Sequence, residues 1–442
     1  MTRLGTQLAA SGGFVSLAEF HRAIWLFLIF WTLVQGARGQ GLNVEFMGYV
    51  PTPGTAQGVF VSSTTAFVTA FDTGLQNVNV TDPSAPFIIG SYTPLQGKAE
   101  RVSVSGGIAY LADGPAGLQI IDVSNPFGPF FRGSLSTTGY VKGIFVSGTM
   151  AYLAEGGNGL ETVDVTFPFM PISRSTFDTP GYAQSVFVSG TTAFVADSTP
   201  GLQVVNVANP FTPIFMSSYT TPDAAADIFV VGTIAYVATG TFGLQILDVS
   251  NPFAPSFRGA YIMPGKAAGV FVVNNLAYVA TDSGLYVIDV TDPNSPVFRG
   301  SYLTPFPAVK VFVALNLAYV ADGQGGLWIL RYTGPGVPAP PSNVQAAAVS
   351  QSQINLSWQN NSTNESGFRI HRRLGTNGAW SLLATVPAHV TAYQDNGLAP
   401  DMVYSYRVHA FNAVGISDWS NECSARTSVL TTRARGSWSR YE

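Results

Sequence analysis

Four acidic side chains recur at one place in a repeated pattern and could do chemistry together. Each precedes a Gly-rich or Pro-bearing turn, and the four are Asp113, Glu155, Asp197 and Asp322. Repetition would place these carboxylates around one face of a closed ring, where an acidic rim could attract a metal ion such as calcium or a basic partner. The other reading is that each carboxylate caps its own turn. The Asp-x-Asp-x-Asp spacing of a calcium loop does not occur in the sequence.

Residues for ordinary acid–base or nucleophilic catalysis are sparse. The four histidines, His21, His371, His389 and His409, lie outside residues 40–333. That region also lacks cysteine, so it has neither the ligands of a common zinc site nor a Ser-His triad. The single cysteine, Cys423, is interpreted as a small, half-buried strand residue. We therefore predict no catalytic residue and no cofactor, while a glycosidase-like pair of carboxylates stays open in principle.

A second set of acidic or amide side chains recurs before a turn that carries Pro in most copies. Asp or Asn at such a position can accept a hydrogen bond from the backbone two residues on and hold the turn. The presence of Asn in two copies argues against proton transfer by this set. Its members, 41 to 43 residues apart, are Asn79, Asp122, Asp164, Asn206, Asp248, Asp289 and, in the last copy, Arg331.

An aromatic residue follows the proline of four of these turns. The four are Phe127, Phe169, Phe211 and Phe253. A stacking platform for sugar rings is conceivable, but a repeated position without polar companions favours a hydrophobic seal between neighbouring repeats.

The elements that must position these residues are short strands. A fixed period of about 40 residues, built from β-branched and aromatic runs, is typical of a β-propeller with one blade per repeat. Residues 226–262 divide into four strands by alternation and turn signals. Seven first strands can be counted, from residues 58–61 to 310–313. Because the last repeat ends after its third strand, we expect residues 44–50 to supply its fourth.

The ends of the chain differ in composition from the repeats. Residues 23–34 are apolar and uncharged after a basic flank, which predicts a secretory signal over residues 1–39 with cleavage after Gly39. An uncleaved membrane anchor is the alternative. Residues 334–341 form a Pro-rich linker, and residues 342–429 show about seven strands of an immunoglobulin-like sandwich. The tail, residues 430–442, is expected to be disordered.

Two resemblances to known families follow from these motifs. The repeat Leu-Gln-Ile-Ile-Asp-Val-Ser-Asn-Pro, beginning at Leu118, resembles the LVIVD repeat, which implies a propeller, usually on exported or surface proteins. The C-terminal part resembles a fibronectin type III domain through residues 341–344, 356–358, 398–400, 404–408 and 412–417. That resemblance implies that Trp358 is the core tryptophan and that Tyr404 forms a tyrosine corner.

Composition narrows the classes of partner. Charged residues make up 10% of the chain and the net charge is −4, so the basic stripe of a nucleic-acid binder is missing. We expect an all-β, secreted or cell-surface protein that binds an extracellular protein or a glycan without catalysis, with no nucleic-acid partner and no membrane span after signal cleavage. The alternative is an exported enzyme acting on polysaccharide, with the type III domain as an accessory module.

Overall fold

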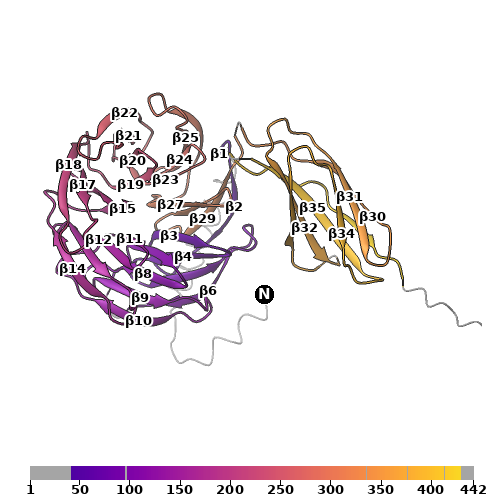
Figure 1. Cartoon of the computed structure of the whole chain (residues 1–442), viewed down its shortest axis with the longest axis horizontal. Coiled ribbons are helices and arrows are strands. Elements are labelled where there is room, and N and C mark those ends of the chain that lie inside the picture. The colour runs from indigo at the N-terminus through magenta and orange to yellow at the C-terminus, as the bar shows by residue number, and fades with distance from the viewer. Residues whose placement is uncertain (1–40, 95–96, 335, 376, 413, 430–442) are drawn as a thin grey trace, which may run out of the picture.

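The computed structural model describes residues 41–94, 97–334, 336–375, 377–412 and 414–429. Within them, seven sheets stand around a ring and a two-sheet sandwich follows (Figure 1). The all-β fold predicted from the sequence, a seven-bladed β-propeller with an immunoglobulin-like sandwich, is therefore confirmed. The predicted signal (1–39) and tail (430–442) lie outside the described residues. In the described part of the chain, no helix has the length and apolar character needed to cross a membrane.

The first strand of each blade lies next to the ring axis. Each first strand contacts the first strands of the two neighbouring blades, and β27 contacts β3, so the ring is closed. The first strands of blades 1 to 7 are β3 (Ala56–Ser62), β7 (Arg101–Ser105), β11 (Gly143–Ser147), β15 (Ser185–Ser189), β19 (Asp227–Val231), β23 (Ala267–Val273) and β27 (Lys310–Ala314).

The second and third strands form the middle of each blade. Their residues are almost all buried, because both faces of these strands pack against neighbouring blades. The second strands are β4 (Thr65–Ala70), β8 (Ile108–Ala112), β12 (Met150–Ala154), β16 (Thr192–Ala196), β20 (Ile234–Ala238), β24 (Leu276–Thr281) and β28 (Leu317–Ala321). The third strands are β5 (Gly74–Asn79), β9 (Leu118–Asp122), β13 (Leu160–Asp164), β17 (Gly201–Asn206), β21 (Leu244–Asp248), β25 (Gly284–Asp289) and β29 (Leu327–Tyr332).

The fourth strands form the outer circumference, and each contains a one-residue bulge that increases its twist. In blade 7 this strand comes from the beginning of the chain, because β2 pairs antiparallel with β29. A short strand, β1 (Gly41–Leu42), extends blade 6. The fourth strands are β6 (Phe87–Tyr92), β10 (Phe130–Leu135), β14 (Ile172–Phe177), β18 (Ile214–Thr220), β22 (Ser256–Tyr261), β26 (Val297–Tyr302) and β2 (Val44–Val50).

The C-terminal domain is a sandwich of two antiparallel sheets. One sheet holds β30 (Ser342–Ala348), β31 (Gln353–Gln359) and β34 (Ala392–Asn396); the other holds β33 (Ser381–Pro387), β32 (Gly367–Leu374), β35 (Val403–Phe411) and β36 (Cys423–Arg426). Trp358 is buried against Phe368, with ring centroids 5.6 Å apart. The Tyr404 hydroxyl accepts a hydrogen bond from the Ala399 N–H at 3.1 Å, as expected of a tyrosine corner.

The two domains meet at blade 7 (Figure 1). Arg331, at the end of β29, forms ion pairs with Glu45 on β2 and with Asp418 of the sandwich. Val337 and Val414 pack beside the apolar core of blades 6 and 7. The carbonyl oxygen of Gly336 also accepts a hydrogen bond from the side-chain amide of Asn412 at 2.7 Å. These contacts tie the segment after the propeller to the sandwich.

Candidate functional site

The two faces of the ring carry different residues. Antiparallel pairing places the beginnings of the first and third strands at one face, called here the start face, and their ends at the other, the end face. The turns between second and third strands lie on the start face. The turns between third and fourth strands lie on the end face. Loops on a rigid scaffold are common binding elements, so the loops of either face could hold a ligand.

The four carboxylates predicted as an acidic rim lie on the start face, but the structure does not bring them together. Asp113, Glu155, Asp197 and Asp322 come from blades 2, 3, 4 and 7, and at most 1% of each is exposed. Asp197 accepts hydrogen bonds from the Thr179 hydroxyl at 2.6 Å and the Gly181 N–H at 2.9 Å. Among the described residues, no three His, Cys, Asp or Glu side chains group as metal ligands would. The donor set for a shared calcium ion is therefore missing from this part of the chain.

The backbone, and not the carboxylate, closes the turn at this position. The N–H of Asp197 bonds to the carbonyl oxygen of Gly201 at 2.8 Å, and Thr239 makes the same bond to Gly243. The acid instead reaches the loop that leads into its own blade: Phe306 N–H donates to Asp322 at 3.3 Å. At Asp197 and Asp322 the side chain therefore fastens an incoming loop, which differs from a turn-capping role. The carboxyl oxygens of Asp113 and Glu155 have no hydrogen-bond partner among the described residues.

Burial keeps several of these carboxyl groups protonated near neutral pH. Burial raises the pKa of Asp113 to about 7 and that of Asp322 to about 8. Burial, together with the nearby Glu161, raises the pKa of Glu155 to about 8. Burial also raises the pKa of Asp197, although its two hydrogen bonds oppose the change. Neutral carboxyl groups are poor ligands for a hard cation.

On the end face, the Asp or Asn at the end of each third strand holds its turn as predicted. Asp122, for example, accepts a hydrogen bond from the Ser124 N–H at 3.0 Å, and equivalent bonds occur in blades 1, 3, 4, 5 and 6. The identity of the bulge residue in the fourth strand depends on whether the third strand ends in Asp or Asn. Asp pairs with Arg in four blades, as in Asp248 with Arg258 at 2.6 Å. Where Asn79 and Asn206 replace Asp, the bulge carries Ile89 and Met216. The Asp-to-Asn exchange therefore removes an ion pair and keeps the turn.

The prediction that the repeated phenylalanines seal adjacent blades is wrong. Phe127, Phe169, Phe211 and Phe253 are 56–68% exposed. The seam is closed by the proline carbonyl beside them, which accepts a hydrogen bond from a buried side chain of the preceding blade. Such bonds join Asn77 to Pro126 at 2.9 Å, Thr162 to Pro210 at 2.6 Å and Ser217 to Pro252 at 2.6 Å.

We expect Ser217→Ala to destabilise the propeller and Phe253→Ser to have little effect. Removing the Ser217 hydroxyl leaves the buried Pro252 carbonyl without its donor, which costs about 1–2 kcal/mol. The neighbouring Phe253 ring is 66% exposed, so its loss changes stability within about 0.5 kcal/mol. Urea unfolding of the two variants measures this contrast. A larger loss for Phe253→Ser than for Ser217→Ala would contradict the assignment of the seam.

The strongest departure from repetition lies where the first strands begin, at the start face. Strand register makes seven residues equivalent here, and we call this the ring position: Gly58, Arg101, Gly143, Ser185, Asp227, Gly269 and Lys310. At Gly269 a Cβ atom would approach the Val309 carbonyl oxygen to 2.7 Å, so glycine lets the next blade pack closely. Three blades instead carry a charged residue at this position: Arg101, Asp227 and Lys310.

Asp227 joins four blades through one carboxylate. It accepts hydrogen bonds from the Ser185 hydroxyl of blade 4 at 2.7 Å and from the Val270 N–H of blade 6 at 2.9 Å. It also pairs with the ammonium group of Lys310 from blade 7. Asp227 is fully buried, whereas the Lys310 side chain is 20% exposed. The carboxylate is thus fully engaged inside the ring, and the lysine keeps part of its surface open.

Arg101 of blade 2 adds a second cation to this cluster. It donates a hydrogen bond to the Gln57 carbonyl oxygen, and its Nε atom has no partner among the described residues. Burial acts to raise the pKa of Asp227, but the charges of Lys310 and Arg101 outweigh it and hold that pKa below the ordinary value. Burial lowers the pKa of Lys310, with Asp227 opposing this change and Arg101 adding to it. The ring position therefore holds two cations and one carboxylate.

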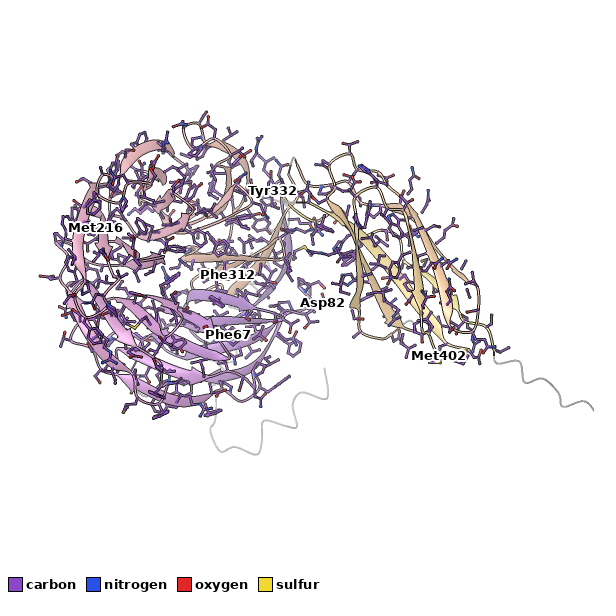
Figure 2. The ribbon with its side chains drawn as sticks, viewed as in Figure 1. Phe67, Asp82, Met216, Phe312, Tyr332 and Met402 are labelled. Carbon is purple, nitrogen blue, oxygen red and sulfur yellow. The ribbon has the colours of Figure 1, made fainter. Side chains whose placement is uncertain are left out.

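A belt of phenylalanine rings lies two residues further along the first strands. Neighbouring rings have centroids 4.6–5.1 Å apart, and Figure 2 labels one of them, Phe312, on the inner strand β27. The belt consists of Phe60, Phe145, Phe187, Phe229, Phe271 and Phe312. In blade 2 the equivalent residue is Ser103. Blade 2 thus departs from the repeat twice, with Arg101 at the ring position and Ser103 in place of the phenylalanine.

Sequence reasoning did not find Arg101, Asp227 and Lys310. One signal in the sequence could have found them. Most positions of the seven first strands repeat from blade to blade, but the first residue of each counted strand changes between glycine, serine and charged residues. A second unlike group lies nearby on the start face: Glu100 accepts bonds from the Tyr140 hydroxyl and the Lys142 ammonium, both at 2.8 Å. The charges of Glu100 and Lys142 cancel each other, so this group does not change the surplus of one positive charge at the ring position.

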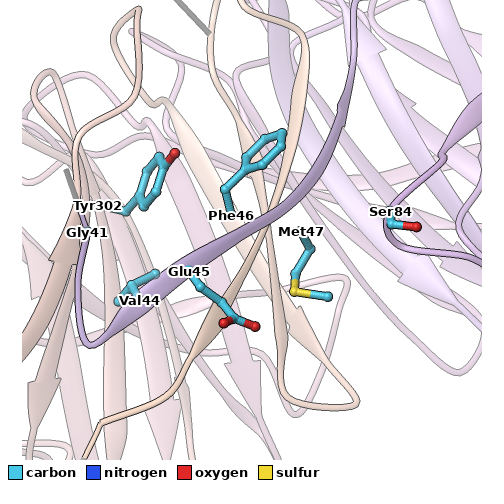
Figure 3. A pocket seen from close by; sticks show the side chains of 7 residues that line it. All are labelled: Gly41, Val44, Glu45, Phe46, Met47, Ser84 and Tyr302. Carbon is cyan, nitrogen blue, oxygen red and sulfur yellow. The ribbon is translucent and has the colours of Figure 1, made fainter. Parts of the chain in front are cut away.

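An open cavity of about 550 Å³ lies elsewhere, along β2 (Figure 3). Glu45, Phe46 and Met47 of β2 line it, and Ser84 and Tyr302 complete its walls. Glu45 already pairs with Arg331. The cavity therefore belongs to the closure of blade 7 and to the junction with the sandwich.

The histidines and the cysteine of the sandwich form no reactive group. His371 meets Trp419 edge-on and His409 packs against it at a tilt, with ring centroids 4.8 and 4.3 Å away. Burial lowers the pKa values of the two histidines to about 4 and about 3. Cys423 lies in β36, half-buried, and burial raises its thiol pKa to about 11. A thiol with that pKa is almost entirely protonated at neutral pH.

Comparison with known proteins gives partial sequence matches and a shared fold. The chain is 37% identical over 93 residues to an alpha-amylase of Niallia circulans, covering 20% of this chain and 7% of that protein. It is 34% identical over 106 residues to human contactin-6, and the match covers 22% of this chain and 10% of contactin-6. The chain thus spans a tenth or less of the curated relatives it matches first. The solved extracellular domain of BT4673 from B. thetaiotaomicron has a TM-score of 0.52 and 11% identity over 87% of this chain and 59% of that one.

Two family descriptions match along the chain. The fibronectin type III domain matches residues 339–426. The LVIVD repeat matches seven times, at residues 53–94, 96–137, 138–179, 180–221, 223–262, 264–304 and 308–330. These repeats cover more than half of the sequence and coincide with the blades. The chain belongs to the LVIVD repeat family and carries a C-terminal fibronectin type III domain.

Proposed function

We propose that this chain is a non-catalytic binding module of the cell surface or extracellular space that captures a protein or a glycan on the start face of its propeller. The observation that carries the proposal is the ring position, where Arg101, Asp227 and Lys310 break the repeat. Residues that serve only the fold are expected to repeat in every blade. Unlike residues gathered at one place indicate a function beyond the fold.

The domain types fit such a module. LVIVD repeats and a fibronectin type III domain suit extracellular binding or adhesion, and the match to contactin-6 is a partial one to its type III region. The sandwich would act as a spacer or second contact, fixed to blade 7 through Arg331 and Asp418. The closed ring would hold its loops rigidly, which lowers the entropy lost when a ligand binds.

A catalytic role has less support from the geometry. Asp227, the carboxylate nearest the axis, is engaged with Ser185, Val270 and Lys310. A group held ionised in this way is suited to an ion pair and not to proton transfer. The match to an alpha-amylase covers only 20% of this chain and 7% of that enzyme.

Binding of the purified full chain to glycan and extracellular-protein arrays tests the proposal. We expect Tyr182→Ala, which removes a start-face ring that is 38% exposed, to weaken binding about tenfold, a loss typical of one interface aromatic. Phe169→Ala is the matched control, because this end-face ring is 68% exposed. Loss of binding in Phe169→Ala but not in Tyr182→Ala would show that the ligand binds the end face and not the start face. An absence of any ligand on both arrays would refute the binding function.

A further inference from the structure

The charge balance at the ring position leaves a place for an anion. The described ring position holds two cations, Arg101 and Lys310, and one carboxylate, Asp227. Asp227 is fully buried and its oxygens are engaged, so it cannot balance a second cation by moving toward solvent. Partly buried cations gain most from a charge-assisted hydrogen bond, since little water competes there. A ligand carboxylate between Arg101 and Lys310 would complete two pairs.

The surroundings of the two cations restrict the rest of the ligand. Farther from the axis, the start face carries the exposed carboxylates Asp72, Asp178 and Asp282. The same face also carries the exposed lysines Lys98 and Lys266. The carboxylates accept hydrogen bonds from hydroxyl groups, and the mixture of charges leaves no continuous basic surface. Exposed or half-buried rings, including Tyr182 and Phe242, lie among them. Acceptors and flat apolar surfaces together suit a sugar, which presents many hydroxyl donors and apolar ring faces.

We propose that the start face binds an otherwise neutral glycan through one carboxylate-bearing sugar, a uronate, whose carboxylate lies between Arg101 and Lys310. This inference rests on the proposed function, since it names the ligand class for the same face. The mixed exposed charges of this face do not suit a polyanion such as heparin, which needs a continuous basic surface. The guanidinium of Arg101 offers a forked pair of donors to the carboxylate, and the ammonium of Lys310 offers a point charge.

Calorimetry with the full chain tests this inference with matched probes. The first probe is a xylo-oligosaccharide that carries one glucuronate branch, and the others are the same oligosaccharide without the branch, heparin and an acidic peptide. We expect the branched probe to bind at least tenfold more tightly than each of the others. Raising the salt from 50 to 500 mM should weaken the binding of the branched probe and leave that of the unbranched probe unchanged, because only the branched probe has a charge contact that salt screens.

Two variants separate the anion contact from the fold. Arg101→Gln should weaken binding of the branched probe at least tenfold and leave binding of the unbranched probe unchanged. Lys266→Met is the control, because this start-face lysine is exposed and lies outside the ring position, and this variant should bind as the unsubstituted chain does. Thermal unfolding checks that both variants fold, and Arg101→Lys should restore part of the affinity.

The outcomes distinguish this inference from the function on which it rests. Equal binding of the branched and unbranched probes, or full binding by a folded Arg101→Gln chain, would overturn the uronate assignment and leave a glycan-binding module. Binding of the acidic peptide or of an arrayed protein alone would also overturn it and would leave the binding function in place. A chain that binds none of the probes and nothing on the arrays would refute both.

Discussion

Replacing Asp227 with asparagine is expected to lower the free energy of unfolding of the propeller by about 3–5 kcal/mol, since it leaves a buried cation without its counter-ion. The carboxylate is the common partner of Ser185, Val270 and Lys310, which belong to three different blades. Asparagine keeps the shape of the side chain but loses the charge that holds Lys310. Urea unfolding followed by tryptophan fluorescence would measure the change.

The control for Asp227 lies in the same blade. Asp248 pairs with Arg258 at 2.6 Å, but the arginine side chain is 43% exposed, and exposed pairs contribute about 0–1 kcal/mol. Asp248→Asn should therefore change stability little. Combining Asp227→Asn with Lys310→Met should recover part of the loss, because the ammonium group that lost its counter-ion is then absent. Equal losses for Asp227→Asn and Asp248→Asn would show that the axial cluster does not hold the ring together.

The stability of the propeller is expected to fall as the pH rises from about 4 to about 8. In the unfolded chain, carboxyl groups titrate near pH 4. In the folded chain the pKa is raised to about 7 at Asp113 and to about 8 at Glu155 and Asp322. The folded state therefore holds more protons across this window, and each such group lowers the free energy of unfolding by up to about 1.4 kcal/mol per pH unit. Unfolding midpoints in urea at pH 5, 6, 7 and 8 measure the slope.

Two substitutions assign this slope to the buried carboxyl groups. Asp322→Asn should make the pH dependence shallower and should stabilise the protein at pH 8, because the amide carries no charge. Asp248→Asn should leave the slope between pH 5 and 8 unchanged, since hydrogen bonds from Ser250 and Arg258 lower the pKa of Asp248 to about 2. Its contribution is present above pH 4 and is lost only as the pH falls toward 2. A midpoint that rises between pH 5 and 8 would contradict the buried, protonated state of these groups.

The repeat made the architecture predictable, because its period and turn residues are local features. The seven blades could be inferred in this way. The core position of Trp358 and the tyrosine corner at Tyr404 followed instead from the resemblance to a fibronectin type III domain. The turn role of Asp122 and its equivalents could be inferred as well, because the hydrogen bond spans two residues.

The candidate site could not be inferred because its contacts span blades. Lys310 and Asp227 are 83 residues apart, and no local pattern pairs them. The repeat also misled the interpretation of Phe127 and its equivalents. A repeated aromatic suggests packing, yet the neighbouring proline carbonyl closes the seam and leaves the ring exposed. In a repeat protein, the position that changes from blade to blade was the more informative one.

The pairing of β2 with β29 also sets an order on biosynthesis. Val44–Val50 leaves the ribosome long before its partner, Leu327–Tyr332, has been made. At about 5–20 residues per second, the intervening chain takes roughly 15–60 s to synthesise. Until then six blades stand as an unclosed arc, and the face of blade 1 that packs against blade 7 stays exposed. When β29 is made, its outer edge is open until β2 pairs with it. The ring is thus completed only after translation of the propeller has ended, so β2 must stay unpaired and free of aggregation throughout that interval.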